Sequence, residues 1–250
     1  MISYASAIAT VDLDSGAITP LITDLPALGN HPNTQLAFGP DSWVYFGLGL
    51  ISNAGVVGLD NAWLEARPEL FDVPCRDVVI ASAPYVSPNP FTEDPDDFTA
   101  TSPYQPFGEV IPIDTRLPEA TKCNGAVFRF QPDDPEGTLE VFVWGFLSAF
   151  GVAVDREGAV WIIDDGPDAK GSRLAVPYAP ETLWRFVVAD AGIWTGLPDY
   201  VAGIPVTDAR YATPGEARPL EFIFANHAEL LTGPATPRPA ATWRPHTGSG

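Results

Sequence analysis

His31 is the residue whose type and position best suit it for chemistry, because it stands just ahead of a predicted strand that begins near Gln35. The ordinary pKa of a histidine is about 6.5, so its imidazole is neutral, and therefore basic, at physiological pH. A neutral imidazole in such a position can act as a general base. In the alternative interpretation, His31 caps a turn or faces solvent.

The other histidines, His227 and His246, are isolated in the sequence. We find no Gly-x-Ser-x-Gly, P-loop, His-Glu-x-x-His or Cys-x-x-Cys motif, so no motif supports a hydrolase or a nucleotide-binding site. Four tryptophans fall in or beside predicted strands, where we expect them to pack in the core and not to stack on sugars. They are Trp144, Trp161, Trp184 and Trp194.

Cys75 and Cys123 are the only cysteines of the chain. Because no further Cys or His ligands lie near them in the sequence, the pair fits a disulfide better than a metal site. The alternative is a pair of buried free thiols. A disulfide would indicate an oxidising compartment, so we expect a periplasmic or extracellular protein, although no signal peptide is visible at the start of this sequence.

Composition excludes several classes of partner. The 32 acidic residues outnumber the 13 basic ones and give a formal net charge of -19, which repels nucleic acids and anionic membrane surfaces. No apolar run reaches the roughly 18 residues that a membrane-spanning helix needs. Hydrophobic residues make up 46% of the chain, enough for a large core, and the 27 prolines and 22 glycines punctuate short apolar runs. This pattern is typical of a turn-rich all-β fold.

The elements that must position His31 form a repeated pattern. Residues 30–53 contain two apolar runs around Gly39-Pro40-Asp41, which predicts two strands and a tight turn, and residues 150–166 repeat the arrangement. Units of about four strands in ~40 to 50 residues are typical of β-propeller blades. A β-sandwich would not give such a repeat, and an α/β fold would need helical periodicity, which is not seen.

Residues 52–122 interrupt this rhythm with a long stretch rich in Pro, Asp and Asn. We interpret it as a loop excursion within a single domain that covers residues 1–250. The two cysteines lie near its ends and could close it, as loops of this length are usually functional or tied down.

Several segments, in order along residues 30–205, resemble the glucose/sorbosone dehydrogenase family of soluble quinoprotein sugar dehydrogenases. They are HPNTQLAFGPDSWVYFGLG, NGAVFRFQPDDPEGTLEVFVWGF, FGVAVDREGAVWIIDDGPD, ETLWRF and TGLPDYVAGIP. The resemblance implies a six-bladed β-propeller that oxidises a sugar or related alcohol with pyrroloquinoline quinone (PQQ) and calcium. It also implies that His31 is the general base on the sugar hydroxyl while hydride passes to PQQ.

The resemblance further implies positions for the cofactors. Leu147, Ser148 and Phe150 match the segment that faces the quinone. Gly166 and Pro167, in the loop after the second hairpin, and the downstream Glu181 match the calcium site, for which carbonyl and carboxylate oxygens are suitable ligands. The alternative for this loop is an ordinary solvated acidic turn.

Three positions depart from the family pattern. Leu147 stands where the family has an arginine that polarises the quinone, and leucine supplies neither the charge nor the hydrogen-bond donors. Leu50 replaces an aspartate, and Leu197 replaces a tryptophan. Two other functions therefore stay open, namely a non-catalytic propeller that only binds its ligand and a calcium-dependent, lactonase-like hydrolase.

The length of the chain predicts an incomplete propeller. Six blades of ~40 or more residues, plus the excursion, need clearly more than 250 residues. We expect about three blades in an open arc. The basic residues that hold the carboxylates of PQQ in the family come largely from later blades, so we expect this chain to bind PQQ weakly or not at all.

Overall fold

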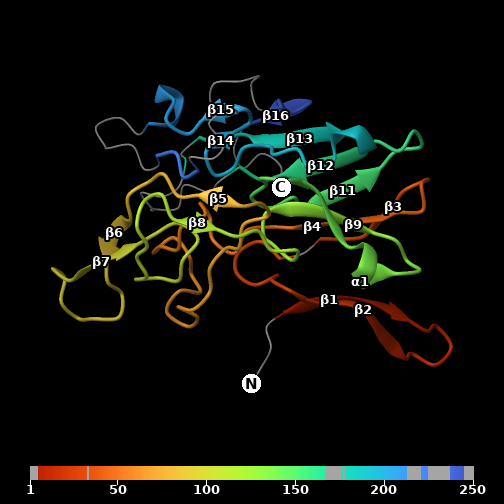
Figure 1. The fold of residues 1–250 in the computed structure, drawn as a ribbon, viewed down its shortest axis with the longest axis horizontal. Helices are drawn as coiled ribbons and strands as arrows, with labels where there is room; N and C mark the ends of the chain where they lie inside the picture. Colours follow the sequence, from red (N-terminus) through yellow and green to blue (C-terminus); the bar gives the residue numbers. More distant parts are fainter. Residues whose placement is uncertain are drawn as a thin grey trace.

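Short apolar runs on both sides of polar turns build two four-stranded antiparallel sheets (Figure 1). The structure is a computed structural model that describes residues 5–32, 34–166, 176, 178–212, 221–224 and 237–244. In the first sheet the spatial order is β10-β9-β4-β3. Its strands are β3 (Ala37–Phe38), β4 (Val44–Leu48), β9 (Ala126–Phe130) and β10 (Glu140–Trp144).

The second sheet repeats this design, with the order β11-β12-β13-β16. Its strands are β11 (Gly151–Val154), β12 (Val160–Asp164), β13 (Glu181–Phe186) and β16 (Ala241–Trp243). Asp155 closes the turn between β11 and β12, because its Oδ1 accepts hydrogen bonds from the backbone N–H groups of Glu157 and Ala159. The predicted repeat of the hairpin is therefore confirmed.

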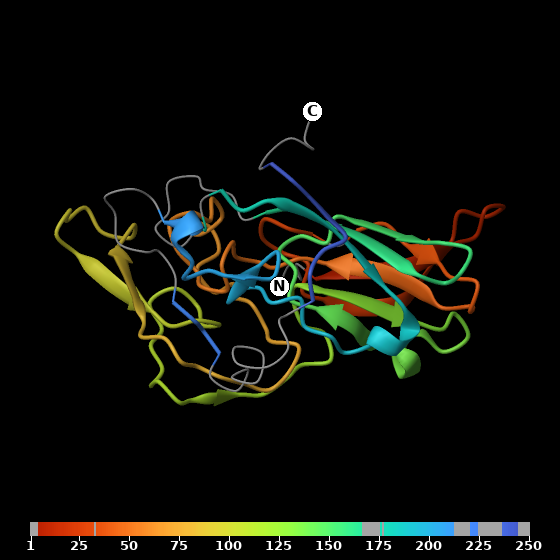
Figure 2. The same ribbon diagram turned by 90° about the horizontal axis from the view of Figure 1, so that it is seen from above.

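The two sheets pack on each other through a shared core. β11 contacts both β3 and β4, and the sheets lie next to each other in Figures 1 and 2. Tyr45 and Phe142 of the first sheet and Ile162 and Trp184 of the second belong to one buried apolar cluster. The all-β class and the four-stranded, blade-like sheets are thus confirmed, and the described residues contain two complete sheets of this kind.

A separate hairpin lies below the sheets in Figure 1, formed by β1 (Ser6–Val11) and β2 (Ile18–Leu25). Its buried Ile22 and Leu25 join the main core. The one-turn helix α1 (Pro135–Thr138), where the sequence predicted only a turn, links it to the first sheet. Glu136 of α1 accepts a hydrogen bond from the Thr23 backbone N–H at 3.0 Å.

The excursion of residues 52–122 extends to the opposite end of the molecule from the strand turns (Figure 2). It holds two small sheets, β5-β8 and β6-β7. Their strands are β5 (Val78–Val79), β8 (Arg116–Leu117), β6 (Tyr85–Pro88) and β7 (Phe98–Thr101). Ala54, Val56 and Tyr104 are buried in the main core, so much of the excursion packs against the sheets.

The predicted disulfide is confirmed, because Cys75 and Cys123 are bonded and their Cα atoms lie 5.0 Å apart. The bond joins the chain just ahead of β5 to the chain just ahead of β9. Both cysteines are buried. A disulfide of this kind is typical of proteins that fold in an oxidising compartment.

The segment after β13 carries several short ordered elements. It contains the 3₁₀ turns η1 (Val188–Asp190) and η2 (Ala209–Tyr211) and a hairpin of β14 (Tyr200–Val201) and β15 (Ile204–Pro205). Ala202 and Gly203 form the two-residue turn of this hairpin, and both have positive φ, as a type I′ turn requires. Within the described residues, no helix has the length and apolar character to cross a membrane.

Candidate functional site

His31 lies in the loop between β2 and β3, half-buried, with its imidazole facing the start of the excursion. The His31 Nε2 atom is 3.1 Å from the Oδ1 atom of Asn53. The side-chain amide of Asn30 donates to the same oxygen at 3.0 Å. His31, which we predicted from the sequence to be the general base, therefore belongs to a defined hydrogen-bond network.

The network continues to Asp60 and Asn61, which sequence reasoning missed. The amide nitrogen of Asn53 donates to the carboxylate of Asp60 at 3.1 Å, and that of Asn61 donates to the other carboxylate oxygen at 3.2 Å. Asn53 and Asn61 are buried. The sequence gives little signal for these contacts, because an apolar stretch at positions 54–59 separates Asn53 from Asp60 and the contacts depend on how the excursion folds back.

Gly49 brings His31 next to Leu147. A Cβ atom added at Gly49 would lie 2.4 Å from the His31 Cβ and 2.8 Å from the Leu147 carbonyl oxygen. The neighbouring Leu50 donates its backbone N–H to the same Leu147 carbonyl at 2.8 Å. The structure thus places the His31 side chain and the backbone carbonyl of Leu147 around the same point beside Gly49, which has no room for a side chain.

Asp164, the last residue of β12, fixes the loop that follows β10. Its carboxylate accepts hydrogen bonds from the backbone N–H groups of Leu147 at 3.4 Å, Ser148 at 2.7 Å and Ala149 at 2.9 Å. Burial raises the pKa of Asp164 to about 7, while these three hydrogen bonds act in the opposite direction. Leu147 and Ser148 are buried, whereas Phe150 is 42% exposed.

Two further buried aspartates hold backbone loops in the same way. Asp72 accepts hydrogen bonds from the backbone N–H groups of Ile51 and Ser52, and burial raises its pKa to about 6. Asp199 accepts hydrogen bonds from the backbone N–H groups of Ile223 and Phe224, and burial raises its pKa to about 7. Loop positions on both sides of the sheets therefore depend on carboxylates that are not at the surface.

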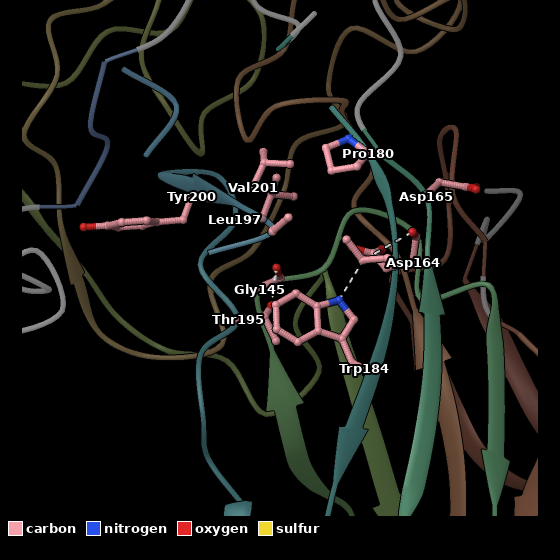
Figure 3. Close-up of a pocket in the computed structure, with 12 residues that line it drawn as sticks. Gly145, Asp164, Asp165, Pro180, Trp184, Thr195, Leu197, Tyr200 and Val201 are labelled. Carbon is pink, nitrogen blue, oxygen red and sulfur yellow. Dashed lines mark hydrogen bonds between the residues drawn. The ribbon is translucent and has the colours of Figure 1, made fainter. Parts of the chain in front are cut away.

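A small pocket lies beside this loop, between the end of β12 and the β14–β15 hairpin (Figure 3). Asp164, Asp165, Gly166 and Pro180 line one side of the pocket, and Leu197 with the hairpin lines the other. A Cβ atom at Gly166 would lie 2.5 Å from the Ala179 carbonyl oxygen and 2.8 Å from that of Pro180. Main-chain oxygens are therefore close to the loop for which the sequence predicted calcium.

Of the three residues predicted to bind calcium, the structure places one in the lining of the pocket. Gly166 lines the pocket, Glu181 is buried at the start of β13, and Pro167 lies outside the described residues. Among the residues that the structure describes, no three His, Cys, Asp or Glu side chains are grouped as a metal site would require. A site made mainly of carbonyl oxygens does not need such a group, so the calcium site stays a prediction.

The pocket does not fit PQQ as the described residues stand. The space that water can occupy inside the pocket is small, on the order of one water molecule. Of the residues that the structure describes around it, two are carboxylates and none is basic, and PQQ carries three carboxylates of its own. Leu197 supplies apolar surface, and the indole N–H of the buried Trp184 donates to the Thr182 hydroxyl at 2.7 Å.

Neither the known protein-family models nor the curated proteins match the sequence. Among solved structures, the chain is similar to an iodide structure of a Trichoderma reesei enzyme of Carbohydrate-Active Enzymes Family AA12. The sequence identity is 12%, the match covers 95% of this chain and 50% of that chain, and the TM-score is 0.46.

Two further solved structures are similar to the chain at low sequence identity. A glucose dehydrogenase matches with 16% identity over 87% of this chain and 48% of that chain, with a TM-score of 0.40. The PQQ-bound form of aldose sugar dehydrogenase from Streptomyces coelicolor matches with 14% identity over 80% of this chain and 61% of that chain, with a TM-score of 0.27. The chain spans about half the length of the first two structures.

Proposed function

We propose that this chain is the sugar-binding part of a β-propeller oxidoreductase of the sugar dehydrogenase type, and that His31 accepts the proton of a sugar hydroxyl. The observation that carries the proposal is the position of His31, held by Asn53 and packed against Gly49 beside Leu147. The disulfide supports a periplasmic or extracellular location.

The residues around His31 have the chemistry that sugars require. Asn30, Asn53, Asp60 and Asn61 present amide and carboxylate groups in one connected network. Hydroxyl groups of a sugar can bond to the exposed Asn30 and the half-buried Asp60, while the imidazole takes the proton that an alcohol must lose when it is oxidised. We assign no hydride acceptor to the described residues, because the pocket beside Leu147 does not fit PQQ.

A binding function without oxidation is the second candidate. The leucine at position 147 supports it, as does the finding that none of the described residues lining the pocket is basic. In this case the polar network would recognise a sugar or related alcohol, and His31 would serve as a hydrogen-bonding group only. Net charge makes nucleic acid an unsuitable partner for either function.

Two measurements on the same set of variants distinguish the two functions. Aldose binding is measured by calorimetry, and dye reduction is measured with PQQ and calcium added, for the unmodified chain, His31→Gln and Asn89→Ala. Oxidation that is lost only in His31→Gln supports the enzyme. Aldose binding without dye reduction supports the binding module, and the absence of both activities in the unmodified chain rejects the two functions together.

A further inference from the structure

The amide groups around His31 can each be oriented from their partners. Backbone carbonyl oxygens only accept hydrogen bonds. The Asn61 amide nitrogen lies 3.0 Å from the Gly58 carbonyl oxygen, and the Asn53 amide nitrogen lies 3.3 Å from the Asp60 carbonyl oxygen. Each of these two amides must therefore direct its NH₂ group toward a carbonyl and its oxygen away from it.

Both amide oxygens meet the NH₂ group of Asn30. The Asn30 nitrogen is 3.0 Å from the Asn53 Oδ1 atom and 3.3 Å from the Asn61 Oδ1 atom. The backbone carbonyl oxygens, which cannot donate, thus fix the orientation of the Asn53 and Asn61 amides, and these two amides in turn fix that of Asn30. Reversing any one of them would place two acceptors or two donors against each other.

The Asn53 oxygen, fixed in this way, also faces the His31 Nε2 atom at 3.1 Å. A lone pair on Nε2 would repel this oxygen, whereas an N–H group would donate to it. We infer that Asn53 holds His31 in the tautomer that carries its proton on Nε2, so that the atom that accepts a proton from a bound hydroxyl is Nδ1. Asn53 is a positioning residue because it acts through His31.

The burial of the network strengthens the preference for one tautomer. Asn53 is 7% exposed and Asn61 is 2% exposed, so water competes poorly for their amide groups. A neutral imidazole carries one N–H, and placing it on Nε2 leaves the lone pair on Nδ1. The role of Nδ1 as proton acceptor rests on the proposed function, whereas the position of the proton on Nε2 does not.

Nitrogen NMR of the full chain tests the position of the proton. The chain has three histidines, so the imidazole signals of His31 are identified by their loss in His31→Gln. At about pH 8, where an ordinary imidazole is neutral, we expect protonated Nε2 and unprotonated Nδ1 signals. We also expect cross-relaxation between the Nε2 proton and the Asn30 side-chain amide protons, and either a protonated Nδ1 or the absence of that cross-relaxation overturns the inference.

Asn53→Leu removes the acceptor while it keeps a side chain of similar size. We expect the His31 signals to shift toward the tautomer mixture of a free histidine and the Nε2 proton to exchange faster with water. Asn89→Leu is the matched control, because Asn89 donates to Asp97 at 3.1 Å within the excursion and should leave the His31 signals unchanged. Unchanged His31 signals in Asn53→Leu also overturn the inference, and if that variant does not fold, the Asn30 cross-relaxation decides.

Addition of an aldose tests the role of Nδ1. We expect the Nδ1 signal of His31 to shift on binding and the Nε2 signal to keep its position. A shift confined to Nε2 overturns the assignment of Nδ1 as the proton acceptor. If neither nitrogen responds to any aldose, the proposed function and the Nδ1 assignment both fail, while the assignment of the proton to Nε2 stands on the unliganded spectra.

Discussion

At the scale of single residues, steric packing determines the geometry of the candidate site more than charge does. His31 and the Leu147 carbonyl can both lie close to Gly49 because a glycine has no side chain. The Leu147 side chain is buried in the main core. An arginine at position 147, as in the family that the sequence resembles, would therefore need the loop from Gly145 to Phe150 to take another course.

Gly49→Ala is expected to disturb both the fold and the site. The new Cβ would lie 2.4 Å from the His31 Cβ, so the loop must move, at a cost of about 1–3 kcal/mol in the free energy of unfolding. Aldose binding should weaken at the same time, because His31 is displaced. Urea unfolding and calorimetry measure the two effects.

Gly151→Ala is the matched control for this substitution. A Cβ at Gly151 would meet Ile163 at 3.5 Å, an ordinary contact distance, in strand β11. Stability and aldose binding should stay near those of the unmodified chain. Equal effects of the two substitutions would mean that the space around Gly49 is not what holds His31 in place.

At the scale of elements, the sheets are local structures, whereas the excursion is held by long-range contacts. Asp72 and Asn124 connect the excursion to the loops of the first sheet, since Asn124 donates to the Pro26 carbonyl oxygen at 2.7 Å and accepts from the Val73 N–H at 3.0 Å. The disulfide lies next to these contacts. The excursion therefore depends on a few anchors close to the end of β4.

Replacing Cys75 and Cys123 by serine is expected to lower the free energy of unfolding by about 2–4 kcal/mol, because the bond closes a loop with a sequence separation of 48. The urea midpoint measures this loss. Treatment of the unmodified chain with a reductant should reproduce it, and the double variant should not respond to the reductant. A double variant as stable as the unmodified chain would show that the anchors around Asp72 hold the excursion without the bond.

At the scale of the whole molecule, buried carboxylates and the large negative charge both make stability depend on pH. The folded-state pKa values of Asp72 and Asp199, about 6 and about 7, lie above their ordinary values. At pH values between the ordinary pKa of an aspartate and these raised folded-state values, the folded chain binds more protons than the unfolded chain. The free energy of unfolding therefore falls as pH rises through this range. Carboxylates with lowered pKa values, such as Asp155, act at more acidic pH.

We therefore expect the urea midpoint to be higher at pH 5 than at pH 8. Asp199→Asn should show a smaller difference between the two pH values, because its amide does not titrate. The unmodified chain at high salt is the control for general charge repulsion, which salt screens while it leaves buried groups largely unaffected. A midpoint that rises from pH 5 to pH 8 would contradict the role of these aspartates.

The same charge distribution governs cofactor binding. A net charge of -19 opposes a ligand with three carboxylates, and so do Asp164 and Asp165, the two charged side chains among the described residues that line the pocket. We expect the chain to bind PQQ with calcium more weakly than micromolar, as measured by absorbance titration. Leu147→Arg is the comparison variant, and we expect it not to restore PQQ binding, because the side chain at position 147 is buried in the main core and does not line the pocket. Micromolar binding by the unmodified chain would refute this account of the site.

The sequence by itself determined the elements whose contacts are local. Apolar runs around Gly39-Pro40-Asp41 and Asp155-Arg156-Glu157-Gly158 encode hairpins, because the turn residues and the alternation of side chains act within a few positions. The repeat, the all-β class and the position of His31 ahead of a strand follow from them. The disulfide was also predictable, because only two cysteines are present.

Only the tertiary structure decided how these elements meet. Asn53 and Asp60 reach His31 through a fold of the excursion that no local pattern encodes, and Asp164 holds the Leu147 loop across 17 positions of the sequence. The hairpin after Leu197 has strands of only two residues, which carry too little pattern to be recognised in the sequence. Contacts between distant segments are selected by burial and by the pairing of buried polar groups, and these depend on the assembled chain.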